Sequence, residues 1–232
     1  MKKILLQIFT LTIFLTSGVS EKEQNAASKV AALWNAENSS IGHTKTADTE
    51  KGTHNVMVVT LKNLKTVDDK YSKDKITSAS ALTLIENLRK EDYQDFDQIK
   101  IIIENNSTSY EKTYEINKLV NTILLLNEIT QFFDYSSTRD TLNLKSIISS
   151  KDIPDSGLIS ILQANNQIDS TYGKLNHITI TGFRYDHVNK TNEPAIVAWT
   201  DVFNGNTLTN YSFYISEESK KIIYIGINDG EK

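Results

Sequence analysis

The residues best suited to chemistry gather in one stretch, residues 173–188, with the sequence GKLNHITITGFRYDHV. This stretch carries His177, Arg184, Asp186 and His187, and so two of the four histidines of the chain. A histidine beside a carboxylate is a common arrangement for general acid–base catalysis. His177 and Asp186 lie nine residues apart, which in one extended strand corresponds to about 30 Å. A joint site would therefore need another strand or another subunit, and the sequence predicts a strand with one solvated face.

His177 and Arg184 remain candidates for ligand binding, together with Trp199. The alternation of residues 197–203 places Trp199 on one face with Asp201, whose other neighbours there are apolar. A carboxylate in apolar surroundings has its pKa raised by desolvation and can act as a base. Asp201 is therefore the candidate catalytic residue, and the alternative is a position at the polar rim beside the Asn204–Gly205 turn.

Other arrangements that support catalysis or metal binding are missing from the sequence. His43 and His54 flank a polar stretch with Asp48 and Glu50, but their spacing matches no metal-site pattern, and a solvated loop is the expectation. The chain has no cysteine, which excludes thiol catalysis, thiolate metal sites and disulfides. No nucleotide-binding, zinc-protease or serine-hydrolase motif is present. The sequence predicts neither a metal nor a cofactor.

The N-terminus has the layout of a secretory signal peptide. Lys2 and Lys3 precede the apolar run 4–15, and Gly18 and Ser20 place small residues before a cleavage site after Ser20. The alternative is an uncleaved N-terminal anchor. No cysteine follows the run, so the chain is not a lipoprotein. Without disulfides, an exported protein of this size is typical of bacteria, and we expect a periplasmic or secreted location.

The mature chain is expected to be acidic and without a membrane span. Removal of residues 1–20 takes away two lysines and changes the formal net charge from −4 to −6. This charge argues against non-specific binding to nucleic acid, which needs a basic surface. No other segment is apolar enough to cross a membrane.

Hydrophobic periodicity predicts two α+β units after the signal peptide. Residues 21–117 form the first unit, with a polar leader at 21–28, a helix, a loop at 38–53, then strand, helix, strand and strand. Ile99, Ile101 and Ile103 are expected to share one face. Asn117 is expected to cap a buried helix that opens the second unit, residues 118–232.

The second unit is predicted to carry helices first and then a four-stranded antiparallel meander. The apolar face of its first strand moves from even positions (Ile178, Ile180) to odd positions (Phe183, Tyr185), and the change falls at Gly182. A β-bulge at Gly182 would keep all four side chains on the face toward the helices. Asn204–Gly205 predicts a tight hairpin between the second and third strands.

The order and lengths of these elements carry a resemblance. STYGKLNHITITGFRY, followed by IVAWTDVFNGNTLTNYSFYI and KKIIYIGIN, resembles the cystatin-like fold of the nuclear-transport-factor-2-like superfamily, as found in small uncharacterised domains of secreted bacterial proteins. The resemblance covers about residues 118–230, whereas residues 25–117 resemble no characterised family. It implies helices on a curved sheet around a cone-shaped cavity, in a superfamily that includes isomerases, dehydratases, assembly domains and scaffolds.

Three functions are consistent with the sequence. The first is an exported, non-catalytic module of the bacterial envelope that binds a protein or a small ligand through its sheet. The second is a cavity enzyme of the isomerase or hydratase type, in which Asp201 is the base. The third is a structural role in a homodimer formed through the sheet. The missing catalytic motifs favour the first.

Overall fold

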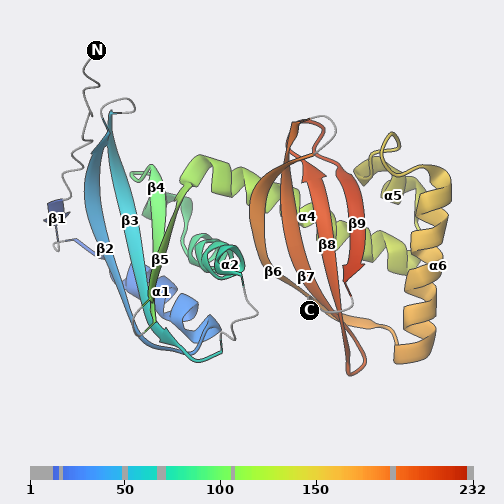
Figure 1. Cartoon of the computed structure of the whole chain (residues 1–232), viewed down its shortest axis with the longest axis horizontal. Helices are drawn as coiled ribbons and strands as arrows, with labels where there is room; N and C mark the ends of the chain where they lie inside the picture. Colours follow the sequence, from blue (N-terminus) through green and yellow to red (C-terminus); the bar gives the residue numbers. More distant parts are fainter. Residues whose placement is uncertain are drawn as a thin grey trace, which may run out of the picture. The chain divides into compact units, whose positions relative to one another are not determined.

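The computed structural model describes residues 13–15, 18–48, 52–66, 72–105, 108–188 and 192–228. It is an α+β protein whose chain divides into two compact units (Figure 1). The first unit comprises residues 1–69 and 80–119, and the second comprises residues 70–79 and 120–232. The division near Leu119 lies close to the boundary expected at residue 117, whereas residues 70–79 belong to the second unit. Most of the predicted signal peptide lies outside the described residues.

The first unit is built on a mixed sheet. Its strand order is β1 (Ile13–Leu15), β2 (Ala36–Asp48), β3 (Gly52–Leu64), β4 (Gln98–Asn105) and β5 (Thr108–Glu115). The β3–β4 pair is parallel and the other pairs are antiparallel. Parallel strands need a crossover connection, which here contains α2 (Lys73–Glu86) and α3 (Lys90–Tyr93).

The core of this sheet follows the alternation of its central strands. Ile99, Ile101 and Ile103 of β4 are all buried, as predicted. They lie opposite Met57, Val59 and Leu61 of β3, which are fully buried as well. Rows of apolar residues on one face of neighbouring strands therefore form the main core of the first unit.

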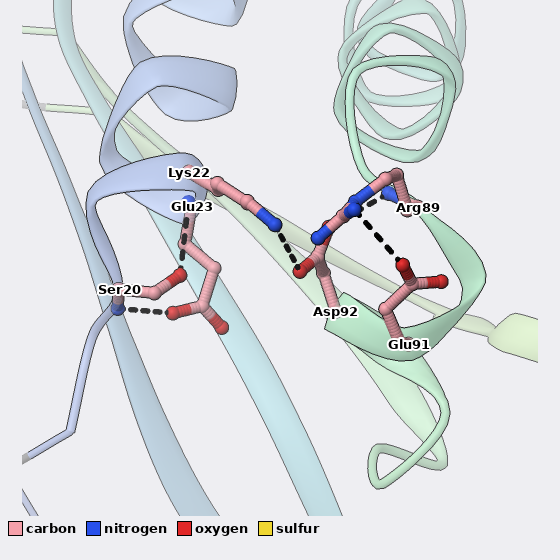
Figure 2. A network of polar contacts seen from close by, with 6 residues as sticks. All are labelled: Ser20, Lys22, Glu23, Arg89, Glu91 and Asp92. Atoms are coloured by element: carbon pink, nitrogen blue, oxygen red, sulfur yellow. Dashed lines mark hydrogen bonds and ion pairs between the residues drawn. The ribbon is translucent and has the colours of Figure 1, made fainter.

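The predicted polar leader at residues 21–28 is wrong, because α1 spans Glu21–Leu33. Figure 2 shows the capping box that starts this helix. The Ser20 hydroxyl accepts a hydrogen bond from the Glu23 backbone N–H at 3.2 Å, and the Glu23 carboxylate accepts one from the Ser20 N–H at 2.6 Å. These bonds satisfy backbone donors that a helix start otherwise leaves free, so polar residues begin a helix here.

The predicted loop at residues 38–53 is wrong as well. Residues 36–48 form β2, which pairs with β3 along an unbroken antiparallel register. Glu37 to Ser40 of β2 are exposed, so both faces of the strand carry polar residues there. The strand forms because β3 offers a long hydrogen-bonding edge, and no apolar alternation is needed for that.

Besides residues 73–79 of α2, the described part of the second unit contains three helices and the predicted four-stranded meander. The helices are α4 (Ile116–Thr138), whose first residues belong to the first unit, α5 (Thr141–Ile147) and α6 (Asp155–Tyr172). The strands are β6 (Leu175–Val188), β7 (Glu193–Asn204), β8 (Thr207–Ser216) and β9 (Ile222–Asn228), paired antiparallel in sequence order. Asn117 does not cap α4, because the helix begins one residue earlier, directly after β5.

The predicted bulge in β6 is confirmed. The register with β7 shifts between Ile180 and Gly182, and Gly182 has φ 146°. The shift places Ile178, Ile180, Phe183 and Tyr185 opposite Val202, Thr200, Ala198 and Ile196, in that order. These alternate residues of β7 share one face, so the four predicted side chains do too.

The helices cover this face, which we call the inner face. The Tyr185 hydroxyl lies 3.0 Å from the Thr122 hydroxyl of α4, and the rings of Phe213 and Phe132 pack 5.4 Å apart. The opposite face of the four strands is the outer face. Among the described residues no helix is both long enough and apolar enough to cross a membrane.

Candidate functional site on the outer face of the β6–β9 sheet

The outer face is organised in rows of residues that lie opposite each other on neighbouring strands. One row runs through Arg184, Val197, Tyr214 and Tyr224, and another through Thr179, Asp201 and Asn210. Residues directly opposite in antiparallel strands project on the same side and contact each other. His177, Arg184, Trp199 and Asp201, the four residues selected from the sequence, therefore lie on the same face of one sheet.

Arg184 and Trp199 form the centre of this surface. The guanidinium carbon of Arg184 lies 5.9 Å from the centre of the Trp199 ring, which is within range of a cation–π contact. Arg184 also forms an ion pair with Asp186, with Nη2 2.9 Å from Oδ2. The backbone N–H of His187 and the nearby Arg184 hold the pKa of the Asp186 carboxyl below its usual value. Asp186 therefore fixes the orientation of the arginine.

An aromatic pair lies beside Arg184. The rings of Tyr214 and Tyr224 are 5.3 Å apart in an edge-to-face arrangement, and Tyr224 is 55% exposed. The Tyr224 ring lies against the backbone of Gly226, where a Cβ would come within 3.1 Å of it. The two tyrosines and Arg184 line an open hollow of ≈ 520 Å³. Packing against Gly226 and Tyr214 thus presents an aromatic ring to solvent in a defined position.

His177 and Asp201 occupy the other end of the same face and do not bind each other. His177 Nε2 lies 2.8 Å from the Thr179 hydroxyl. The Asp201 carboxylate accepts a hydrogen bond of 2.7 Å from the Asn210 amide. His177 also lines a polar groove of ≈ 590 Å³ with Asp134, Asp169 and Lys174. The structure therefore places His177 and Arg184 in separate hollows.

The structure does not place Asp201 in a cavity beneath the helices. Asp201 lies opposite Thr179 on the outer face, and its neighbours Thr200 and Val202 point to the inner face. Its alternation with Trp199 and Phe203 is as predicted, but the face that they share is the one away from the helices.

Polar side chains of the helices and the sheet form a second cluster on the inner face, which the sequence pattern did not predict. The Tyr211 hydroxyl of β8 donates to the Asn165 side chain of α6 at 3.2 Å, and the Asn165 amide donates to Ser136 of α4 at 3.4 Å. The Asn204 amide of β7 donates to the Asp169 carboxylate of α6 at 2.8 Å. Burial, followed by the negative charge of Asp169, raises the pKa of Tyr211 to about 12.

The cavity bordered by this cluster is small. Its volume is ≈ 30 Å³, which holds about two water molecules and no substrate of ordinary size. Asn165 and Asp169 are four residues apart in α6 and therefore lie on the same side of that helix. This cluster therefore connects the helices to the sheet.

The remaining histidines lie in the first unit and have carboxylate neighbours. His43 Nε2 is 2.9 Å from the buried Glu23 carboxylate, and its ring packs on Phe96. His54 Nδ1 is 3.9 Å from Asp97. Among the described residues, no three histidine, aspartate or glutamate side chains lie close enough together to hold a metal ion. Each imidazole thus lies beside a carboxylate from another part of the first unit.

Comparisons of the chain with protein-family models, with curated proteins and with solved structures give no match. The function is therefore inferred from the geometry of the outer face.

Proposed function

We propose that the chain is an exported, non-catalytic module of the bacterial envelope that binds a protein partner through the outer face of the β6–β9 sheet. The observation that carries the proposal is the arrangement of Arg184, Tyr214 and Tyr224 around one open hollow, with the Trp199 ring 5.9 Å from the Arg184 guanidinium on the same face. Tryptophan, tyrosine and arginine are the residue types that most often contribute strongly to protein–protein binding. Their fixed orientations reduce the entropy lost when a partner binds.

We also propose that the second unit has the cystatin-like fold that its sequence resembles. It is supported by the order of elements, with three helices before a four-stranded antiparallel meander. In such an arrangement the helices cover one face of the sheet, and the other face is available to a partner.

The alternative, a cavity enzyme, has less support. Its proposed base Asp201 is bonded to Asn210 on the outer face. Asp169 borders both the small cavity of ≈ 30 Å³, which leaves no room for a substrate, and the open groove of ≈ 590 Å³ beside His177, but its carboxylate is already bonded to Asn204. An enzyme of this kind would need an enclosed cavity of substrate size, whereas the groove beside His177 is open to solvent.

Site-specific photo-crosslinking in the exporting cell tests the binding proposal. A photoreactive amino acid replaces Tyr224 on the outer face or, as a matched control, Ile159 on α6, which is 55% exposed like Tyr224. We expect a protein adduct of defined mass from position 224, its loss when Trp199→Ala is added, and no such adduct from position 159. Equal adducts from both positions, or none from position 224, would contradict the proposal. An adduct with twice the mass of the chain would identify the partner as a second copy.

Export is tested separately. Mass spectrometry of the protein recovered outside the cytoplasm is expected to show a chain that begins at Glu21. A chain that retains Met1 would contradict processing.

A further inference from the structure

The outer edge of β2 is a long strand edge that is paired over only a short part of its length. β2 pairs with β3 from Ala36 to Asp48. On its other side β1 pairs with His43, Thr44 and Lys45, and no strand among the described residues pairs with 36–42. An unpaired edge presents backbone donors and acceptors that can bind another strand.

This edge lacks the features that usually prevent pairing. The segment 36–42 has the sequence AENSSIG, with one charged residue and no proline. Its register with β3 contains no bulge. By contrast β5, at the opposite edge of the sheet, carries Glu111, Lys112 and Glu115. Charges, prolines and bulges are the usual means by which edge strands avoid association, so the β2 edge is the one open to a partner strand.

The strand β1 shows the direction of pairing that this edge accepts. Ile13–Leu15 pairs with it antiparallel. These residues lie in the predicted signal peptide, so export would remove them and open the edge of β2 along its whole length. The opening of this edge rests on the proposed export.

We propose that two copies of the processed chain pair antiparallel through β2, with Ile41 opposite Ile41 of the second copy. In this register Glu37 lies opposite Lys45 of the second copy, and the two-fold symmetry repeats the pair. Both side chains are exposed. Opposite charges directly across two strands are favourable, which supports this register.

The interactions that Glu37 makes within its own chain are compatible with this pairing. One carboxylate oxygen accepts from the Asn63 amide at 2.8 Å, and the other lies 3.5 Å from the Lys65 ammonium. These neighbours also hold the pKa of Glu37 below its usual value, so the carboxylate is charged near neutral pH. A carboxylate has about four acceptor positions, which leaves capacity for Lys45 of the second copy.

Pairing through β2 also connects assembly with processing. The proposed register pairs Lys45 with Glu37 of the second copy. In a chain that retains its leader, β1 already pairs with Lys45. The unprocessed chain therefore cannot form the pair, and removal of the leader permits it.

Sedimentation velocity of the exported protein, with its N-terminus determined by mass spectrometry, tests the proposal. We expect twice the mass of the processed chain. Lys45→Glu should raise the dimer dissociation constant by about tenfold or more, because it replaces two attractive pairs by two repulsive ones. The double variant Glu37→Lys with Lys45→Glu should restore the dimer, and the exposed control Lys29→Glu on α1 should leave it unchanged.

The outcomes separate this proposal from export. A processed chain that stays monomeric, or a Lys45→Glu dimer as tight as the parent, overturns the pairing and leaves export intact. An unprocessed N-terminus overturns export, and a dimer of that unprocessed chain overturns the competition between β1 and the second copy.

Discussion

The Ser78 hydroxyl accepts a hydrogen bond from the backbone N–H of Phe183 at 2.8 Å. Both residues are fully buried, and both belong to the second unit, to which residues 70–79 of α2 contribute. The bond lies directly after the bulge in β6, which is an edge strand of the sheet that the described residues form. A helix side chain thus provides an acceptor for a buried backbone N–H of this strand.

Replacing Ser78 by alanine should therefore destabilise the protein. The buried Phe183 N–H would lose this acceptor, at a cost of about 1–3 kcal/mol in the free energy of unfolding. Urea unfolding followed by circular dichroism measures the change. Ser160→Ala on the exposed side of α6 is the control, with an expected change within about 0.5 kcal/mol. Equal stabilities of the two variants would contradict the role of Ser78.

Gly182→Val is expected to destabilise the protein by more than about 1 kcal/mol. The φ of 146° at Gly182 is strained for a residue with a side chain, and a Cβ there would lie 2.7 Å from the Lys75 carbonyl oxygen. Gly42→Val in β2 is a matched control, because a Cβ at Gly42 meets nothing within 4 Å. Thermal unfolding of both variants distinguishes them, and a Gly182→Val protein as stable as Gly42→Val would contradict the prediction.

The bulge was predictable because its cause is local. The apolar positions of β6 shift from even to odd numbers within six residues, and Gly182 lies at the shift. The face of Asp201 was not predictable in the same way, because both faces of the middle of β7 are buried at Ile196, Val197 and Ala198. The register that pairs Asp201 with Thr179 decides its face, and register depends on contacts between strands rather than on the sequence of one strand.

The strand β2 was missed for a related reason. Sequence periodicity detects strands that bury one face, and the exposed residues of β2 at 37–40 bury neither. The cluster around Tyr211 likewise joins residues from α4, α6, β7 and β8. Its members are polar residues of ordinary type, so their proximity could be found only in the folded structure.

Alkaline pH should weaken the fold through Tyr211. The folded-state pKa of about 12 exceeds the value of about 10 for an unfolded tyrosine, so the folded chain retains this proton while the unfolded chain loses it. The contribution of Tyr211 is therefore complete below pH 10 and is lost as the pH rises toward 12, with a slope of at most about 1.4 kcal/mol per pH unit. Unfolding of the parent and of Tyr211→Phe at several pH values isolates this slope, which the variant should lack. Parallel pH profiles would contradict the assignment.

The start of α1 gives the last prediction. Ser20→Ala removes the hydroxyl that accepts from the Glu23 N–H, and the loss of an N-cap costs about 0.5–2 kcal/mol. Cleavage after Ser20 would remove the whole capping box and leave a charged amino group at Glu21, which is unfavourable at a helix N-terminus. A chain that begins at Glu21 should therefore be less stable than one that begins at Val19 by a similar amount. Urea unfolding of the two chains measures the difference, with Ser28→Ala inside α1 as the control that leaves the cap intact. Equal stability of the two chains would show that Ser20 contributes nothing to the fold.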